Sequence, residues 1–590
     1  MQTRDSAKGN RFGLEKILCP WLEIIVMVTE NYLCIVRKRY DSHDYRVSDD
    51  TMRLVPACNI PHTNTMALSA AMVIFSLFHR NKPLTFLTHF IGFKHLTTPN
   101  SKEDHPINTF HLKTSIKSLF SNMFLYSAAS LLQSGISFFM VPLYTRFFSH
   151  SDFGAMDQML QFSILLFMVG SMGIGQGIPR AFYFSDHDAE SRKRLIGTAL
   201  SFTLLATGVI AALMIGGERI LFRVLLLNQG KIIWLRLFTA FFVFSTIMQF
   251  QLGLFRLYQR AFDYITWSLL NFALVIAGNI IFIVMFRMGL TGMLLANAIA
   301  SGVVALCMTP MLLKNVTFGL RFRILKPAFE LGLPLMPNML ARKGIDFSAR
   351  MFIPVYCGYE HLALFSLAAK ISGVIETLIL IPIFLAYQPY FYSIHGKTDT
   401  PAVLSRIANI ALVLFGFVYL AVVAAAPLLV RFLGGSSYRN AEPLVAFLAL
   451  GAVFFGMQNV ISAGFHYSGR LIHEAGLMVI SALIFVCLGM IFIPRFGEKA
   501  AAVSYAIAFF VFLASSLVFT RKGLKFTFKW GTIAGVLASS TTGALIIANS
   551  HSMAVRGAVV ALYGLVAALL EWHEVKTGFR ALRSHLFKNC

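Results

Sequence analysis

Long apolar runs dominate this sequence and recur at regular intervals from about residue 118 toward the C-terminus. Of the 590 residues, 57% are hydrophobic and 13% are charged, whereas about a quarter of the residues in a soluble domain are charged. A run of roughly 20 apolar residues is long enough to cross a bilayer as a helix. The pattern therefore predicts an all-α polytopic membrane protein and excludes a soluble enzyme or a soluble nucleic-acid-binding domain.

Fourteen of these runs are predicted to span the membrane. The runs are 118–142, 155–178, 196–216, 232–254, 264–286, 290–313, 330–355, 361–388, 403–430, 441–465, 471–493, 499–520, 528–548 and 554–573. The polar breaks between them are all shorter than twenty residues, which leaves no room for a soluble catalytic domain. Any chemistry is expected in or beside the membrane.

Residues 1–117 differ from the rest and are expected to be an N-terminal extension, poorly ordered or non-native. They hold 15 Lys or Arg and 10 Asp or Glu, and their apolar runs are short or interrupted. The opening residues include acids and lack the uninterrupted apolar stretch of a signal peptide. Translation from upstream of the true start is one explanation for this segment.

Basic residues in the loops predict the orientation. Twenty-three Lys or Arg lie in the breaks on one side of the predicted membrane and ten on the other. Short cytoplasmic loops are enriched in Lys and Arg, so the first span is predicted to enter from the cytoplasm and the C-terminus to lie there. Much of the net charge of +24 is then a topology signal, and no nucleic-acid partner is expected.

An internal repeat predicts two lobes. Pro142 and Tyr144, at the end of the first span, recur as Pro354 and Tyr356 at the end of the seventh, 212 residues later, and three further short matches recur 208–210 residues apart. Duplicated six-helix units in the same orientation place a substrate route between the halves, which favours a transporter. The predicted parts are a first lobe (118–313), a cytoplasmic linker (314–329), a second lobe (330–520), and two extra helices with a basic tail (521–590).

Charged residues within the spans are the main functional candidates, because each is costly in hydrocarbon. The seventh span contains Arg342, Lys343, Asp346 and Arg350, whose spacing of three or four residues lets them meet on one helical face. They carry three positive charges and one negative charge, which predicts an uncompensated cationic stripe. The alternative is an ion-pair network that only fixes helix packing.

Four further residues complete the candidate set. Lys370 in the eighth span and Arg236 in the fourth are assigned, with the three cations of the seventh span, to substrate binding. Glu376 and Asp157, with Asp346, are assigned to ion pairing or coupling.

Prolines and glycines predict bends and close packing. Pro334 and Pro337 weaken the backbone ladder near the start of the seventh span, so a hinge or a plain kink is expected there. The glycine-rich run 170–177 lacks the preceding strand that a phosphate-binding loop requires. Small residues in a span more often allow helices to approach closely.

Catalytic, metal-binding and cofactor sites are not predicted. The seven cysteines show no C-x-x-C pair, and the sixteen histidines show no ligand spacing. The D-H-D at 186–188 is like the metal-binding D-x-D of sugar transferases, but it lies in a short loop with no domain to hold a sugar nucleotide.

Several motifs resemble a known family. They are MVPLYTRFFSHSDFG, IPRAFYFSDHDAESRKRLIGTAL, ELGLPLMP and MFIPVYCGYEHLALFSLAAKISG. This set is similar to the polysaccharide or oligosaccharide (O-antigen-type) flippases of the MATE-like multidrug/oligosaccharidyl-lipid/polysaccharide exporter superfamily. The resemblance covers about 118–530, and the last two helices match by position only.

The resemblance implies a twelve- or fourteen-helix fold with a central cationic cavity. It also implies movement of an undecaprenyl-pyrophosphate-linked sugar from the inner to the outer leaflet of a bacterial cytoplasmic (inner) membrane, for surface polysaccharide synthesis. In that family an Asp-Arg pair is common near the outer end of the seventh span. Here Arg350 matches the Arg while Ala349 replaces the Asp, which puts acid-dependent coupling in doubt.

The expected partners are a lipid-linked oligosaccharide, the lipid bilayer, and a polysaccharide polymerase with other assembly proteins. Two other functions stay open: a drug or cation antiporter of the same superfamily, and a membrane-embedded polysaccharide polymerase or ligase. The absence of Asp and Glu from the first span disfavours the antiporter. The lack of a sizeable outer loop disfavours the polymerase or ligase.

Overall fold

The computed structural model describes most of the chain beyond the predicted N-terminal extension. The described residues are 138, 140–184, 189–227, 230–313, 316–384, 387, 391, 400–521, 530–550 and 552–570. The N-terminal extension, nearly all of the first predicted span and the D-H-D motif lie outside these residues. Every regular element within them is a helix.

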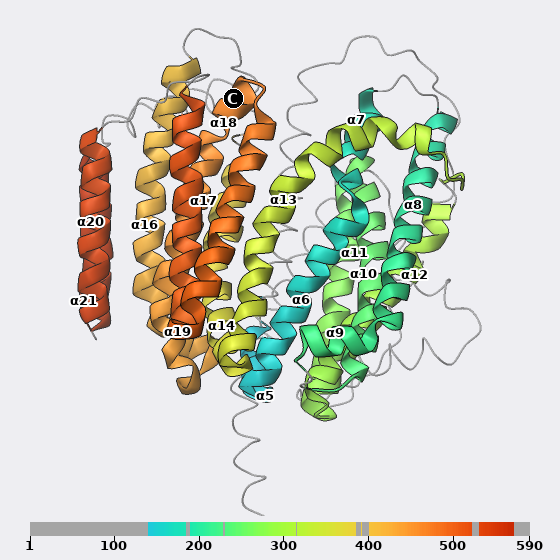
Figure 1. Cartoon of the computed structure of the whole chain (residues 1–590), viewed down its shortest axis with the longest axis horizontal. Coiled ribbons are helices and arrows are strands. Elements are labelled where there is room, and N and C mark those ends of the chain that lie inside the picture. The colour runs from blue at the N-terminus through green and yellow to red at the C-terminus, as the bar shows by residue number, and fades with distance from the viewer. Residues whose placement is uncertain are drawn as a thin grey trace, which may run out of the picture. The chain divides into compact units, whose positions relative to one another are not determined.

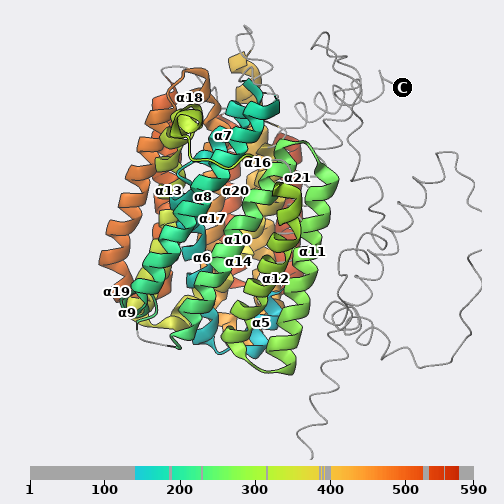
Figure 2. The same cartoon turned by 90° about the vertical axis from the view of Figure 1, so that its right-hand side faces the viewer.

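The helices form two bundles that run side by side, roughly along one axis, with α13 between them (Figures 1 and 2). The first bundle contains α6 (His150–Ser171), α8 (Ala189–Gly216), α10 (Ile233–Leu257), α11 (Ala261–Asn279) with the π-helical turn η2 (Ile280–Met285), and α12 (Gly289–Leu313). The second contains α14 (Tyr359–Ile375) with the π-helical turn η3 (Glu376–Leu380), α16 (Thr400–Gly434), α17 (Glu442–Ile461) and α19 (Leu471–Thr520).

The remaining elements connect or flank the bundles. They are α5 (Val141–Phe147), α7 (Ile174–Phe184), α9 (Glu218–Leu225), α13 (Phe322–Cys357), η4 (Ser436–Ala441), α18 (Ala463–Tyr467), α20 (Trp530–Asn549) and α21 (Met553–Leu570). Helix α13 packs against α6 and α7 on one side and against α14 and α19 on the other. Helices α20 and α21 pack on α16.

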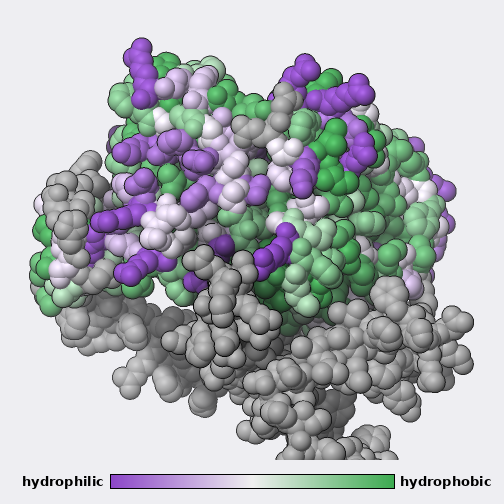
Figure 3. All heavy atoms as spheres, turned by 90° about the horizontal axis from the view of Figure 1, so that it is seen from below, coloured by the Kyte–Doolittle hydropathy of each residue, from purple (hydrophilic) through white to green (hydrophobic). Residues whose placement is uncertain are grey.

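Nine helices among the described residues are long and apolar enough to cross a membrane. Large apolar side chains point outward from them, as on α8, where Leu205, Val209 and Leu213 are 53–69% exposed, as lipid contact requires. Seen from below, hydrophilic residues gather at that end of the molecule beside broad hydrophobic areas (Figure 3). The predicted all-α polytopic architecture is confirmed, while the count of fourteen spans stays a prediction.

Local chemistry explains where the helices at the bundle interface begin and end. Ser149 caps α6, because its side-chain oxygen accepts a hydrogen bond from the Asp152 backbone N–H at 3.0 Å. The helix ends at Met172 and Gly173, both at positive φ. Gly358, at φ +92°, separates α13 from α14. Gly497, at φ +64°, interrupts α19 between the eleventh and twelfth predicted spans.

Helix α13 begins at Phe322, so half of the expected linker 314–329 is helical. Helix α8 likewise starts at Ala189, seven residues before the predicted span. In both cases hydropathy predicts a loop for the basic segment, because Lys and Arg are too polar for hydrocarbon. Lys and Arg are good helix formers, so the helices continue beyond the apolar core.

Glycines in α6, in α7 and in the turn between them allow backbone contact with the helices opposite. A Cβ at Gly154 would lie 2.6 Å from the carbonyl oxygen of Tyr359, and one at Gly177 would lie 2.0 Å from that of Ala328. A Cβ at Gly173 would lie 2.5 Å from the carbonyl oxygen of Gly332. The glycine-rich run 170–177 thus packs helices closely, as predicted. Helices α6 and α14, which the predicted repeat makes equivalent, meet at Gly154.

Replacing Gly332 by Ala is expected to destabilise the protein, because the new Cβ would lie 2.2 Å from the Gly173 carbonyl oxygen. Gly344→Ala is the matched control on the same helix, since nothing lies within 4 Å of its Cβ position. Alanine in place of a mid-helix glycine gains about 0.5–1 kcal/mol. Unfolding of the purified protein by SDS in mixed micelles measures both. Equal stability of the two variants would contradict the close contact of α7 with α13.

Candidate functional site

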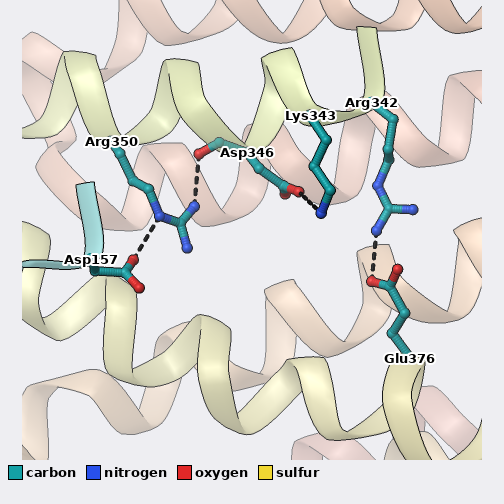
Figure 4. A network of polar contacts seen from close by, with 6 residues as sticks. All are labelled: Asp157, Arg342, Lys343, Asp346, Arg350 and Glu376. Carbon is teal, nitrogen blue, oxygen red and sulfur yellow. Dashed lines mark hydrogen bonds and ion pairs between the residues drawn. The ribbon is translucent and has the colours of Figure 1, made fainter. Parts of the chain in front are cut away.

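Seven charged residues form a row of ion pairs on α13 and the helices beside it. Figure 4 shows all of them except Lys370. Four are cations and three are carboxylates, so the network has a net charge of +1. They are Arg342, Lys343, Asp346 and Arg350 on α13, Asp157 on α6, Lys370 on α14, and Glu376 at the start of η3. Below, these seven residues are called the ion-pair network.

Asp157 joins the two bundles at the most buried end of the network. Its side chain is 1% exposed. One carboxylate oxygen accepts a hydrogen bond from Nε of Arg350 at 2.6 Å, and the other lies 3.1 Å from Nζ of Lys370. Because Asp157 belongs to the first bundle and Lys370 to the second, this trio ties α6, α13 and α14 together.

Arg350 is held in place by its neighbours. Its side chain is 6% exposed. Nη1 donates to the backbone carbonyl of Asp346 at 2.7 Å, and the guanidinium carbon lies 5.7 Å from the ring centroid of Phe365. A buried guanidinium with a carboxylate, a carbonyl and an aromatic face around it has little freedom to reorient.

The other end of the network is more exposed. Arg342 donates from Nη2 to Oε2 of Glu376 at 2.6 Å, and its guanidinium carbon lies 3.6 Å from the ring centroid of Phe455. Lys343 pairs with Asp346 one turn along α13, with Nζ to Oδ2 at 3.2 Å. Glu376 is 37% exposed and Lys343 27%. Ligands therefore have more access to these two pairs than to the Asp157 trio.

The predicted uncompensated stripe is wrong in one respect. From the sequence spacing, Asp346 was the one acidic residue expected to neutralise the cations of α13. The structure supplies two more carboxylates from other helices, Asp157 for Arg350 and Glu376 for Arg342. The missing acid at Ala349 does not leave Arg350 without a partner, because Asp157 on α6 takes that role.

Arg236 lies apart from the network. It is in the first turn of α10, 58% exposed, and forms a two-point pair with Glu218 of α9, with both N···O distances 2.9 Å. The hydrogen bonds from Arg236 lower the pKa of the Glu218 carboxyl below its ordinary value. The structure therefore brings together four of the five cations assigned to substrate binding.

The two predicted hinge prolines lie inside a continuous helix. Pro334 and Pro337 are both within α13, which bends along its length without a break (Figure 1). A bend is the expected effect of prolines that lack an N–H donor. A hinge role for them stays a prediction.

Several residues near the network were not singled out from the sequence. The hydroxyl of Tyr359 lies 2.9 Å from Oε1 of Gln158 and 2.8 Å from the carbonyl of Leu225, which closes the bundle interface beside Asp157. A glutamine beside an in-span Asp was a usable signal for Gln158. Phe455 and Phe509 had no such signal, because they are two of 56 phenylalanines. Among the described residues, no three His, Cys, Asp or Glu gather as metal ligands.

Comparison with known families gives the context for this site. The family described as polysaccharide biosynthesis protein matches residues 119–395. We call residues 119–395, which are similar to this family, the polysaccharide biosynthesis family region. All seven residues of the ion-pair network lie within this region, whereas Phe455 and Phe509 lie beyond it. No curated protein sequence matches the chain.

Solved structures share the fold of much of the chain. The lipid II flippase MurJ, in an inward closed conformation, matches 77% of this chain and 100% of its own at 14% identity, with a TM-score of 0.58. An inward-facing multidrug resistance MATE family transporter of the MOP superfamily matches 67% and 94% at 17% identity (TM-score 0.52). A MOP superfamily transporter from Pyrococcus furiosus, described by the reverse polarity of its binding pocket, matches 68% and 95% at 18% identity (TM-score 0.50).

These similarities establish the fold and the membrane location. The chain is a multi-pass membrane protein with the fold of MOP superfamily transporters. The expected likeness to the MATE-like superfamily is confirmed.

Proposed function

We propose that this protein is a flippase that moves a polyprenyl-pyrophosphate-linked oligosaccharide repeat unit from the inner to the outer leaflet of a bacterial cytoplasmic membrane. The observation that carries the proposal is the gathering of four cations at one interface between two helix bundles, inside a polysaccharide biosynthesis family region. Isolated charges in hydrocarbon cost several kcal/mol each. Three carboxylates pair with these four cations and leave one positive charge in excess, which supports binding of an anion here.

The chemistry of the substrate matches this site. A pyrophosphate that bears a sugar crosses hydrocarbon only at a very large desolvation cost, whereas its polyprenyl tail is stable there. Arg and Lys side chains between the bundles neutralise the phosphates during transit, while the tail stays in lipid. Arg binds phosphate oxygens through two parallel hydrogen bonds, which makes it well suited to this headgroup.

The proposed movement uses the two bundles and helix α13, which packs against both of them. In the proposed mechanism the predicted lobes 118–313 and 330–520 rock against one another, with the linker 314–329 joining them and Pro334 and Pro337 as the hinge. Asp157 changes partners as the bundles separate, because its carboxylate is shared between them. The protein acts as a transporter, with no catalytic residue, metal ion or cofactor. Its partners are the lipid-linked sugar, the bilayer and the polymerase that receives the product.

Lys343→Ala and Arg350→Ala are expected to abolish surface polysaccharide in the organism that makes this protein. Each substitution removes a cation from the proposed phosphate path. The measurement is surface polysaccharide by gel or lectin staining, with membrane levels of each variant matched by immunoblot. Arg236→Gln is the control, since Arg236 lies outside the network, and it should leave export intact. Normal export by both alanine variants at normal protein level would refute the proposal.

The antiporter alternative predicts a different phenotype. A drug or cation antiporter would change resistance to cationic drugs when deleted and would leave lipid-linked sugars unaffected. The flippase proposal predicts that deletion causes a polyprenyl-pyrophosphate-linked sugar to accumulate, which mass spectrometry of extracted lipids detects. The accumulated glycan also identifies the substrate.

A further inference from the structure

The ion-pair network divides into a fixed part and a displaceable part. In the fixed part, Asp157 and Arg350 are 1% and 6% exposed, and each has two or more polar or charged partners. In the displaceable part, Glu376 is 37% exposed and pairs with Arg342. This pair has one exposed member and joins two charges, whereas the Asp157 trio is more buried and joins three, so a ligand has less to displace here.

In the Arg342–Glu376 pair, Arg342 has further contacts that hold its side chain, and Glu376 is the more exposed partner. Arg342 is 10% exposed, and its guanidinium carbon lies 3.6 Å from the ring centroid of Phe455 and 5.2 Å from that of Phe509, two rings that contact each other. Aromatic faces hold a guanidinium through cation–π attraction without using its N–H donors. Accordingly, Nε of Arg342 is buried and has no hydrogen-bond partner. A buried donor of this kind costs about 1–3 kcal/mol until it is satisfied.

Glu376 stands at a position where the backbone is also irregular. It is the first residue of η3, a π-helical turn that follows directly from α14. Single π-helical turns within α-helices are frequent at functional sites. The carboxylate thus lies at the junction of two helical geometries, on the more exposed side of the pair.

We propose that Glu376 is a displaceable counter-ion that occupies Arg342 in the resting protein and is replaced there by a phosphate of the substrate. This inference rests on the proposed function and adds a specificity rule to it. The incoming phosphate satisfies Nε as well as Nη2 of Arg342, as a bidentate ligand does. In this proposal Lys343, the next residue of α13 and 27% exposed, takes a second phosphate.

The rule selects headgroups by charge. Exchanging one carboxylate for a singly charged headgroup leaves the charge at Arg342 unchanged and gains little. A pyrophosphate carries more negative charge and engages both Arg342 and Lys343, so the exchange becomes favourable. Every ligand has to break the same Arg342–Glu376 pair, so a headgroup with a second contact at Lys343 binds at concentrations where a single phosphate does not.

Glu376→Gln is the direct test, because it removes the competing charge and leaves Arg342 in place. Equilibrium binding of inorganic pyrophosphate and of inorganic phosphate to the purified full-length protein is measured for wild type and variant. Pyrophosphate affinity is expected to rise about tenfold, which corresponds to about 1.4 kcal/mol. The affinity for inorganic phosphate is expected to rise by a similar factor, because either ligand breaks the same Arg342–Glu376 pair. Glu360→Gln, on the exposed first turn of α14, removes the same charge away from Arg342 and should change neither value.

A second variant covers the case in which Glu376→Gln does not fold. Glu376→Asp keeps the charge but shortens the side chain by one methylene, which weakens the pair with Arg342. An intermediate rise in pyrophosphate affinity is expected. If wild type binds pyrophosphate and neither variant binds it more tightly than Glu360→Gln, the counter-ion role is overturned while the proposed function stands. If wild type and every variant fail to bind pyrophosphate, the proposed function and the counter-ion role are both overturned.

Discussion

Asp157→Ala is expected to be the most destabilising single substitution in the described part of the chain, lowering the free energy of unfolding by about 3–5 kcal/mol. The carboxylate is 1% exposed and serves two cations, Arg350 and Lys370. Its removal leaves Arg350, 6% exposed, with no carboxylate partner. SDS unfolding in mixed micelles, with the fraction folded followed by circular dichroism, measures the change.

Two further variants show whether the effect arises from unpaired charge. Asp152→Asn removes a carboxylate from the first turn of the same helix and is expected to change stability little. The triple substitution Asp157→Leu, Arg350→Met and Lys370→Met replaces the trio by apolar side chains. Replacing a whole buried ion cluster is often neutral or stabilising, so the triple variant should recover most of the lost stability and still fail to export. A triple variant as unstable as Asp157→Ala would show that packing, and not charge, dominates at this position.

Neutralising the exposed half of the network is expected to stop transport without unfolding the protein. The variant carries Arg342→Gln, Lys343→Gln, Asp346→Asn and Glu376→Gln, so each ion pair is replaced by two neutral amides. A hydrogen bond to a charged group contributes about 1.5–3 kcal/mol, so loss of two cations removes about 3–6 kcal/mol of headgroup stabilisation. At about 1.36 kcal/mol per tenfold, the rate should fall by a factor of 100 or more.

The control for this variant keeps the charge and changes the geometry. Lys343→Arg preserves a cation next to Asp346 and should retain most of the transport rate. Stability of the neutral variant is measured in the same SDS titration. A neutral variant that folds like wild type and transports at the wild-type rate would exclude Arg342 and Lys343 as headgroup ligands.

The cations of α13 were predictable because each stands out in a hydrocarbon-length run. Arg342, Lys343, Asp346 and Arg350 follow one another at helical spacing, and in-span charges are rare enough to be informative. Their partners were less predictable, because Asp157 and Arg350 are 193 residues apart. Only the three-dimensional packing of α6 on α13 shows that the stripe is nearly neutral. The sequence therefore identified the charged residues of α13 and misjudged the net charge around them.

The ends of the helices were also not predictable from hydropathy alone. The apolar runs located the core of each long helix among the described residues, since burial in lipid follows hydropathy. They placed the start of α13 at 330, whereas the helix begins at Phe322. Hydropathy locates the part of a helix that lies in the bilayer. The helix continues beyond the bilayer where the flanking residues have a high helix propensity. Arg236 was misplaced for a related reason, because a residue near the end of a span reaches the surface along its own side chain.

Translocation by the reconstituted protein tests the central claim most directly. The full-length chain is placed in vesicles that contain an undecaprenyl-pyrophosphate-linked oligosaccharide, and a membrane-impermeant reagent reports the fraction of sugar exposed on the outer leaflet over time. The flippase proposal predicts that wild type equilibrates the sugar between leaflets and that the neutral four-residue variant does so at least about a hundred times more slowly. Equal rates for wild type, the neutral variant and protein-free vesicles would contradict it.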